Sequence, residues 1–188
     1  PQKFYDKNLK KEVTPREFAQ AELKLNSGDY YSFMSNALLP FGQRGILQEP
    51  DNWWQGNNYY NLPISTFVSA IKEALLHGYT VVVSGDVTEK TYQPHIPYSW
   101  YNNAGITNMD SLRIVEKLNK STEDNHSWHI VGYYPAKNGW WFYIKDSAFW
   151  DDPINGYHFI HESYLTRKAV SMCMHKYAAR SVVNGIIK

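Results

Sequence analysis

The stretch that decides the fold runs from residue 125 to residue 133 and reads Asn-His-Ser-Trp-His-Ile-Val-Gly-Tyr. It is rich in aromatic and β-branched residues, which favour strands, and we predict a strand over 126–134. Further strand-like segments follow at 140–145, 157–160 and 168–177. Because consecutive strands usually lie beside one another, these segments predict an antiparallel sheet or barrel in the C-terminal part of the chain.

Helix signals precede this strand-rich part. Thr14-Pro15-Arg16-Glu17 is a capping box with proline in the first helical position, so a helix should begin there and end near Gly28. A second helix should run from Pro63 to Gly78, followed by a buried strand at 80–84. Its apolar stripe comprises Ile64, Phe67, Val68, Ile71, Ala74 and Leu75. Helices early in the chain and antiparallel strands late in it predict an α+β fold.

Two long segments show no regular pattern. Residues 29–62 and 88–109 are interrupted by Pro and Gly and are predicted to be loops, with Asp110 capping a short helix after the second one. Long loops often carry function. We therefore expect residues 57–60 and 92–103 to border a cleft rather than to pack in the core.

The composition is that of an ordinary globular protein. Of 188 residues, 43% are apolar and 20% are charged, which fits a single domain over residues 1–188. The 19 Lys and Arg residues nearly balance the 18 Asp and Glu residues, so the basic excess typical of nucleic-acid-binding proteins is missing. No stretch approaches the roughly 20 apolar residues that a membrane-spanning helix needs.

Cysteine and histidine content argues against a metal site. Cys173 is the only cysteine, and its apolar, strand-like context is typical of a buried structural thiol. His126 and His129 are three residues apart, as are His158 and His161. On a strand this spacing places the two members of each pair on opposite faces, where they cannot share a metal ion. We expect neither a metal nor another cofactor.

The first residues of the chain give an indication of the cellular compartment of the protein. The sequence begins at Pro1 without an initiator methionine and without an apolar leader, which predicts a processed chain and favours a secreted or periplasmic protein. A single cysteine leaves the redox compartment open. A homo-oligomer stays an open alternative.

The decisive stretch also resembles the C-terminal part of papain-like cysteine peptidases. That family has an Asn-His or Asp-His pair six residues before the glycine of a Val-Gly-Tyr turn, which Asn125-His126 and Gly132 match. A strand of the family then leads into an Asn-Ser-Trp-Gly motif, which Asp146-Ser147 matches in part. The family's later Gly-Tyr strand corresponds to Gly156-Tyr157.

Other segments are similar to the bleomycin hydrolase, or aminopeptidase C, branch of that family. They are the helix and strand over 63–87 ending in Gly-Asp-Val, the stretch 104–109 before a short helix, and the strand over 168–176. The likeness covers residues 14–178. It implies the C-terminal part of a papain-like fold and a thiol protease that hydrolyses peptide substrates, with endopeptidase and aminopeptidase action both open.

The resemblance also implies roles for individual residues. His126 falls on the catalytic histidine, and Asp146 falls where the family has the asparagine that orients this histidine. Asn125, Ser127 and Trp150 are the implied substrate-binding residues. A cysteine thiol is mostly protonated near neutral pH, so such an enzyme needs an adjacent imidazole, and the imidazole needs a fixed orientation.

The sequence departs from the family at its nucleophile. The family motif that holds the catalytic cysteine does not occur in this chain, and spacing from His126 would put it before Pro1. We therefore expect the cysteine on a second chain or segment. Two alternatives stay open: a non-catalytic relative that binds peptides or glycans by stacking on its tryptophans, and an enzyme that pairs His126 and Asp146 with a serine or threonine nucleophile.

Overall fold

The computed structural model describes residues 2–50, 52–92, 96–147 and 155–186, and the Trp150 predicted to bind substrate lies outside them. The chain forms two compact units, Pro1–Tyr30 and Tyr31–Lys188. No helix of the described residues is long and apolar enough to cross a membrane.

The smaller unit is a hairpin followed by a helix. Strands β1 (Phe4–Asp6) and β2 (Lys11–Val13) pair antiparallel, and α1 (Pro15–Ala21) follows. The predicted capping box is confirmed, because the Thr14 hydroxyl accepts a hydrogen bond from the Glu17 amide and the Glu17 carboxylate accepts one from the Thr14 amide. The rings of Phe4 and Phe18 meet edge to face at 5.4 Å.

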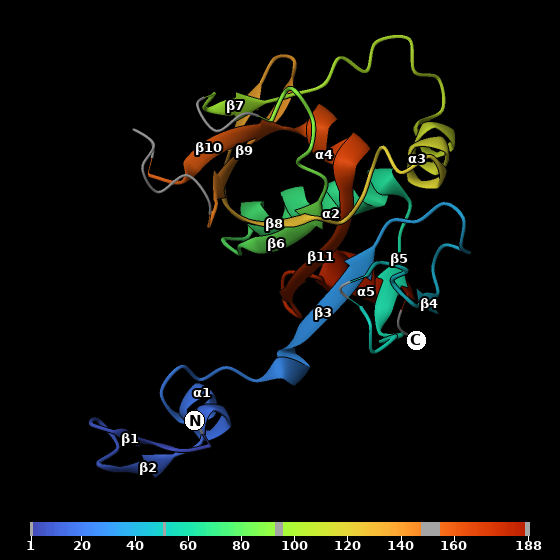
Figure 1. Ribbon diagram of the computed structural model, residues 1–188. Coiled ribbons are helices and arrows are strands. Elements are labelled where there is room, and N and C mark those ends of the chain that lie inside the picture. Colours follow the sequence, from blue (N-terminus) through green and yellow to red (C-terminus); the bar gives the residue numbers. More distant parts are fainter. Residues whose placement is uncertain (1, 51, 93–95, 148–154, 187–188) are drawn as a thin grey trace. The chain divides into compact units, whose positions relative to one another are not determined.

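The larger unit is built on one sheet, which comprises nine strands among the described residues (Figure 1). Its order is β4-β5-β3-β11-β6-β8-β9-β10-β7. The strands are β3 (Tyr30–Met34), β4 (Arg44–Gly45), β5 (Tyr59–Asn61), β6 (Val81–Gly85), β7 (Tyr98–Ser99), β8 (His126–Ala136), β9 (Gly139–Lys145), β10 (Tyr157–His161) and β11 (Ala169–His175). The pairs β8–β9 and β9–β10 are antiparallel, as predicted. Strand β11, expected to continue this series, instead pairs antiparallel with β6, which pairs antiparallel with β8. The pairs β3–β5 and β10–β7 are parallel.

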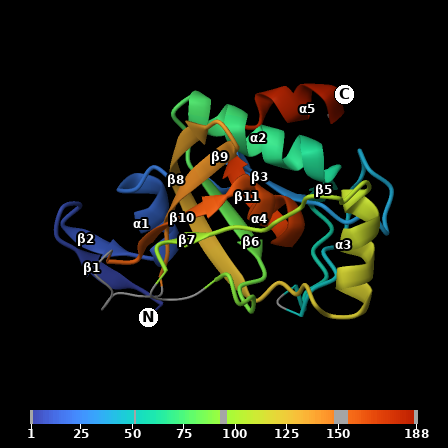
Figure 2. The ribbon, with the colours of Figure 1, turned by 90° about the horizontal axis from the view of Figure 1, so that it is seen from above.

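Helices complete the larger unit and confirm the α+β class. They are α2 (Ile64–Leu76), α3 (Met109–Leu118), α4 (Glu162–Lys168) and α5 (Arg180–Ile186), with a short 3₁₀ turn, η1 (Ser27–Asp29), at the end of the smaller unit. Helix α2 lies along β6 and β8 (Figures 1 and 2). Its apolar stripe faces the sheet, and Gly78 follows the helix with a φ of 78°, a left-handed conformation that suits glycine.

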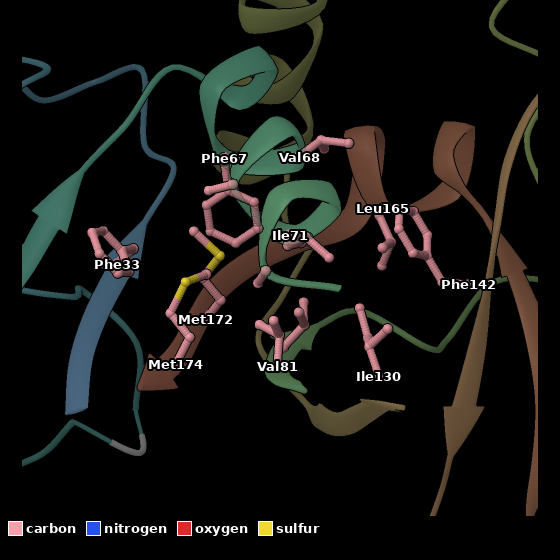
Figure 3. Packing of buried hydrophobic residues seen from close by; sticks show 14 of the residues in the cluster. Phe33, Phe67, Val68, Ile71, Val81, Ile130, Phe142, Leu165, Met172 and Met174 are labelled. Atoms are coloured by element: carbon pink, nitrogen blue, oxygen red, sulfur yellow. The ribbon is translucent and has the colours of Figure 1, made fainter. Parts of the chain in front are cut away.

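The core lies between α2, α4 and one face of the sheet. Ile71 of α2 points toward Val81 of β6, and Leu165 of α4 lies on the side of Ile130 of β8 (Figure 3). All of these side chains are buried. Each one contributes about 1.5–3 kcal/mol when it leaves water. This packing holds β6, β8 and β9 rigidly, and these strands position the candidate site.

The segment 29–62 is more regular than predicted. It contains β3, β4 and β5, and the buried amide of Asn61 holds the loop between them. The Asn61 amide nitrogen donates to the carbonyl oxygens of Asn36, Leu39 and Pro40 at 2.9–3.1 Å, and its oxygen accepts from the Asn36 amide. One side chain therefore replaces the backbone partners that a loop lacks.

Other local predictions were wrong in detail. Helix α4 occupies the stretch before β11, where no helix was expected, and α3 is capped by the side chain of Asn108 instead of Asp110. The loops expected to border a cleft contribute Tyr60 and Tyr92 to the core. Aromatic side chains bury a large apolar area, and this favours the interior over a loop surface.

Candidate active site

His126 and Asp146 meet at one end of the sheet. His126 is the first residue of β8 and Asp146 directly follows β9, and these strands are antiparallel neighbours (Figure 1). The start of one strand therefore lies beside the end of the other. The imidazole Nε2 of His126 is 2.8 Å from Oδ1 of Asp146, so the hydrogen bond predicted between them is present.

A third side chain completes the surroundings of Asp146. The hydroxyl of Tyr92 donates to Oδ2 of Asp146 at 2.5 Å, and Nε1 of Trp128 donates to the Tyr92 hydroxyl at 2.8 Å. The Asp146 side chain is 0% exposed, and that of His126 is 21% exposed. The carboxylate is thus buried with a donor on each oxygen, while the imidazole keeps access to solvent.

Burial fixes the direction of these hydrogen bonds. The pKa of Tyr92 is raised well above its ordinary value, mainly by burial and further by the hydrogen bond to Asp146. The phenol therefore stays protonated and donates. An ionised carboxylate only accepts, so the Nε2 nitrogen of His126 carries the proton and Nδ1 of the neutral ring is an acceptor. Nδ1 is the nitrogen that can take a proton from a reacting group.

Two of the three predicted substrate-binding residues, Ser127 and Asn125, have hydrogen-bond partners other than this pair, and Trp150 lies outside the described residues. Ser127 is paired with Ser84 through their hydroxyls at 2.7 Å, on the face of β8 opposite to His126. Asn125 precedes β8, and its side-chain oxygen accepts a hydrogen bond from the Val87 amide at 3.0 Å. Both residues have structural contacts in the structure, and their role with substrate stays a prediction.

Cys173 lies on the other face of the sheet from His126. In the strand register, Cys173 is opposite Val82, and Val82 is opposite His129. These three side chains share one face, whereas His126 shares the other face with Trp128. Burial raises the pKa of the Cys173 thiol, which keeps it protonated near neutral pH.

The remaining histidines have structural surroundings. His129 lies on the face opposite to His126, as predicted, and burial lowers its pKa. His158 is buried beside the Tyr92 ring, whereas His161 caps α4 and contacts Trp141. Within the described ranges, no group of three or more His, Cys, Asp or Glu side chains is placed to hold a metal ion.

Sequence reasoning missed two members of the site. Trp128 appeared only as a strand residue, and Tyr92 appeared only as part of a loop. Tyr92 is separated from Asp146 by 54 positions, and the local pattern around it signals nothing about this contact. The sequence could have indicated only that Asp146, if buried, needs a second hydrogen-bond donor in addition to His126, because each oxygen of a buried carboxylate needs a donor.

Comparison with known proteins shows the fold alone. No family model and no curated protein matches the sequence. Among solved structures, the chain is similar to the crystal structure of PepW from Lactobacillus rhamnosis HN001, with a TM-score of 0.68 and 15% sequence identity. The match covers 98% of this chain and 44% of PepW, so the chain spans less than half of that protein.

Proposed function

We propose that this chain is the histidine-bearing part of a papain-like cysteine peptidase of the bleomycin hydrolase type, and that its catalytic cysteine comes from a second chain or segment. One observation carries the proposal. The buried carboxylate of Asp146 holds Nε2 of His126 at 2.8 Å and leaves Nδ1 for a thiol. The resemblance of the Asn125–Tyr133 stretch to that family supports it, and so does the similarity in fold to PepW.

In the proposed reaction, His126 moves a proton in both directions. Nδ1 takes the proton of the cysteine thiol, and the thiolate attacks the peptide carbonyl carbon. The imidazolium then gives this proton to the leaving amine as the C–N bond breaks. Water hydrolyses the acyl-enzyme, and its proton passes through Nδ1 to the cysteine sulfur. Asp146 accepts the Nε2–H hydrogen bond throughout and keeps the ring oriented.

The thiol of this chain does not fit the role. Cys173 lies on the opposite face of the sheet from His126, and its raised pKa disfavours the thiolate. A thiol on another segment would instead have to approach His126 from the side of Nδ1. More than half of PepW lies outside the match, so a protein with this fold can contain a further segment that would carry such a thiol.

The proposal is tested on the native protein. Intact mass analysis should reveal a second chain or an attached segment that contains a cysteine. The complete protein should cleave peptides, and His126→Ala should abolish turnover. His129→Ala is the matched control, because this histidine lies on the same strand but faces the other side. Normal turnover in His126→Ala would contradict the proposal, as would native material without a second cysteine-bearing segment.

A non-catalytic binding module is a second candidate, and one observation favours it. Trp53 and Trp54 are 81% and 60% exposed, and their rings meet edge to face at 5.7 Å. Trp53 also lines a cavity of about 390 Å³ together with Gln48 and Gln55. Exposed indole faces beside amide groups suit a sugar ring or an extended peptide. If this is the function, Trp53→Ala should lower binding of such ligands and His126→Ala should not.

A further inference from the structure

We propose that Tyr92 is a positioning residue of the candidate active site, which holds the Asp146 carboxylate in the orientation and charge state that His126 requires. This inference rests on the proposed function. Tyr92 does not touch a substrate or a reacting atom in the proposed reaction. It acts through Asp146, whose Oδ2 accepts the hydrogen bond from the Tyr92 hydroxyl at 2.5 Å.

The tyrosine is held firmly in its place. It is buried, and its ring lies 6.0 Å from the rings of Trp128 and Tyr164 and 5.3 Å from that of His158. These neighbours come from β8, α4 and β10. A loop residue is therefore fixed by three elements of the core, and its hydroxyl cannot leave Asp146 without disturbing them.

The chain of hydrogen bonds has one permitted direction. The indole nitrogen of Trp128 is only a donor, so the Tyr92 oxygen must accept from it. The hydroxyl has a single proton, and this proton points to Asp146. Trp128 thus makes Tyr92 a better donor, and both oxygens of Asp146 accept, one from Tyr92 and the other from His126.

This arrangement suits a carboxylate and does not suit an amide. If Asp146 were asparagine with its oxygen toward His126, its amide nitrogen would face the Tyr92 hydroxyl. Tyr92 would then accept from two donors, and its own proton would lose its acceptor. Tyr92 is therefore matched to an aspartate at position 146, and the two residues should act as a coupled pair.

Removal of the hydroxyl should change the tautomer of His126. In Tyr92→Phe, the buried carboxylate of Asp146 loses the hydrogen bond from the Tyr92 hydroxyl, which favours the protonated acid. A protonated carboxyl group donates to Nε2 instead of accepting from it. We expect the ratio of the Nε2–H to the Nδ1–H tautomer of neutral His126 to fall roughly fivefold, which corresponds to the loss of one ordinary hydrogen bond.

The test is ¹⁵N NMR of the imidazole nitrogens of the full chain, with His126 assigned separately from His158, at a pH where the ring is neutral. Tyr92→Phe should lower the Nε2–H fraction, and the same change in an Asp146→Asn background should have less than about half of that effect. Tyr60→Phe is the matched control. It removes another hydroxyl of a buried tyrosine, which accepts from the Arg44 guanidinium on β4, and should leave His126 unchanged.

Trp128→Phe provides a second route if Tyr92→Phe does not fold. It removes the donor to the Tyr92 hydroxyl and should shift the tautomer ratio in the same direction, but less. An unchanged ratio in folded Tyr92→Phe, or an equal change in both Asp146 backgrounds, would overturn the proposal. The measurement uses no nucleophile and no substrate. Its failure would therefore leave the peptidase proposal standing, and a lack of peptidase activity would not alter the NMR result.

Discussion

His126 and Cys173 lie on opposite faces of the same sheet. The register shows this directly, because Cys173 is opposite Val82, and Val82 is opposite His129, three residues after His126 on β8. Side chains three residues apart on a strand point to opposite faces. The sheet itself therefore separates the thiol from the imidazole, and rotamer changes cannot bring them together.

We predict that the isolated chain is inert toward peptides and that its thiol reacts slowly. Burial raises the pKa of Cys173, so the thiolate fraction near neutral pH should be small. A thiol-directed peptidyl inhibitor should label Cys173 no faster than it labels a free cysteine, as followed by intact mass. Rapid stoichiometric labelling together with peptide turnover would contradict this prediction. Cys173→Ser is the control and should leave the activity of the complete protein unchanged.

Two replacements of Asp146 should distinguish its effect on the orientation of the His126 ring from its effect on the stability of the protein. Asp146→Asn keeps an oxygen for Nε2 of His126, so the complete protein should keep substantial activity, whereas Asp146→Ala should lose more. In this variant the amide nitrogen takes the place of the carboxylate oxygen that accepts the Tyr92 proton. We therefore expect Asp146→Asn to lower the free energy of unfolding by about 1–3 kcal/mol in urea titrations. Equal kcat in the two variants would show that this oxygen does not orient the ring.

The His126–Asp146 pair is predicted by the resemblance of this part of the sequence to papain-like cysteine peptidases, which have the two matching positions on adjacent strands. The antiparallel pairing of β8 and β9 agrees with that expectation. The contact of Tyr92 with Asp146 was not predicted, because it forms only when the fold packs the loop that carries Tyr92 against β8, β10 and α4. Helix α4 has seven residues, which is too short for helical periodicity to stand out, and β5 finds its partner β3 only by a parallel, non-local pairing.

Acid should destabilise the larger unit through His161. This residue caps α4, and its Nδ1 accepts from the Ser163 amide at 3.2 Å. Burial lowers its pKa from 6.5, although Glu162 opposes this shift. The unfolded chain therefore binds the proton more readily, so stability is present above about pH 6.5 and is lost as the pH falls below it.

The test compares urea unfolding of the wild type and His161→Asn at pH 7.5 and pH 5.0. Asparagine is a good N-cap and does not titrate. We expect the variant to lose less stability on acidification than the wild type does. The same pH dependence in both proteins would show that His161 does not titrate on unfolding.

Two lysines should differ greatly in their contribution to stability. Lys168 is fully buried, and its ammonium group contacts Glu89 at 2.5 Å and Thr122 at 2.8 Å. Lys168→Ala removes a fully buried side chain together with its bonds to Glu89 and Thr122, and should cost about 2–5 kcal/mol. Lys72 forms a partly exposed pair with Glu162, so Lys72→Ala should cost about 1 kcal/mol or less. Urea titrations measure both values, and similar losses would contradict the distinction.

Gly85 should control the position of His126. It lies opposite His126 in the register of β6 and β8, and on its other side it approaches β11. A Cβ atom at residue 85 would lie 2.3 Å from the Lys168 carbonyl oxygen, which is backbone and cannot turn away. Gly85→Ala should therefore push β6 and β11 apart, cost about 1–3 kcal/mol of stability, and displace the strand that carries His126.

The matched control for this prediction is Gly132→Ala on β8. A Cβ atom there would lie 3.5 Å from Cβ of Tyr143, which is an ordinary contact, so the variant should stay close to the wild type in stability. In the complete protein, Gly85→Ala should lower kcat more than Gly132→Ala does, because only the first change acts on the strand pair beside His126. If Gly85→Ala is as active and as stable as the wild type, β11 can shift to make room for the added Cβ atom. The conclusion that this sheet holds His126 rigidly would then be wrong.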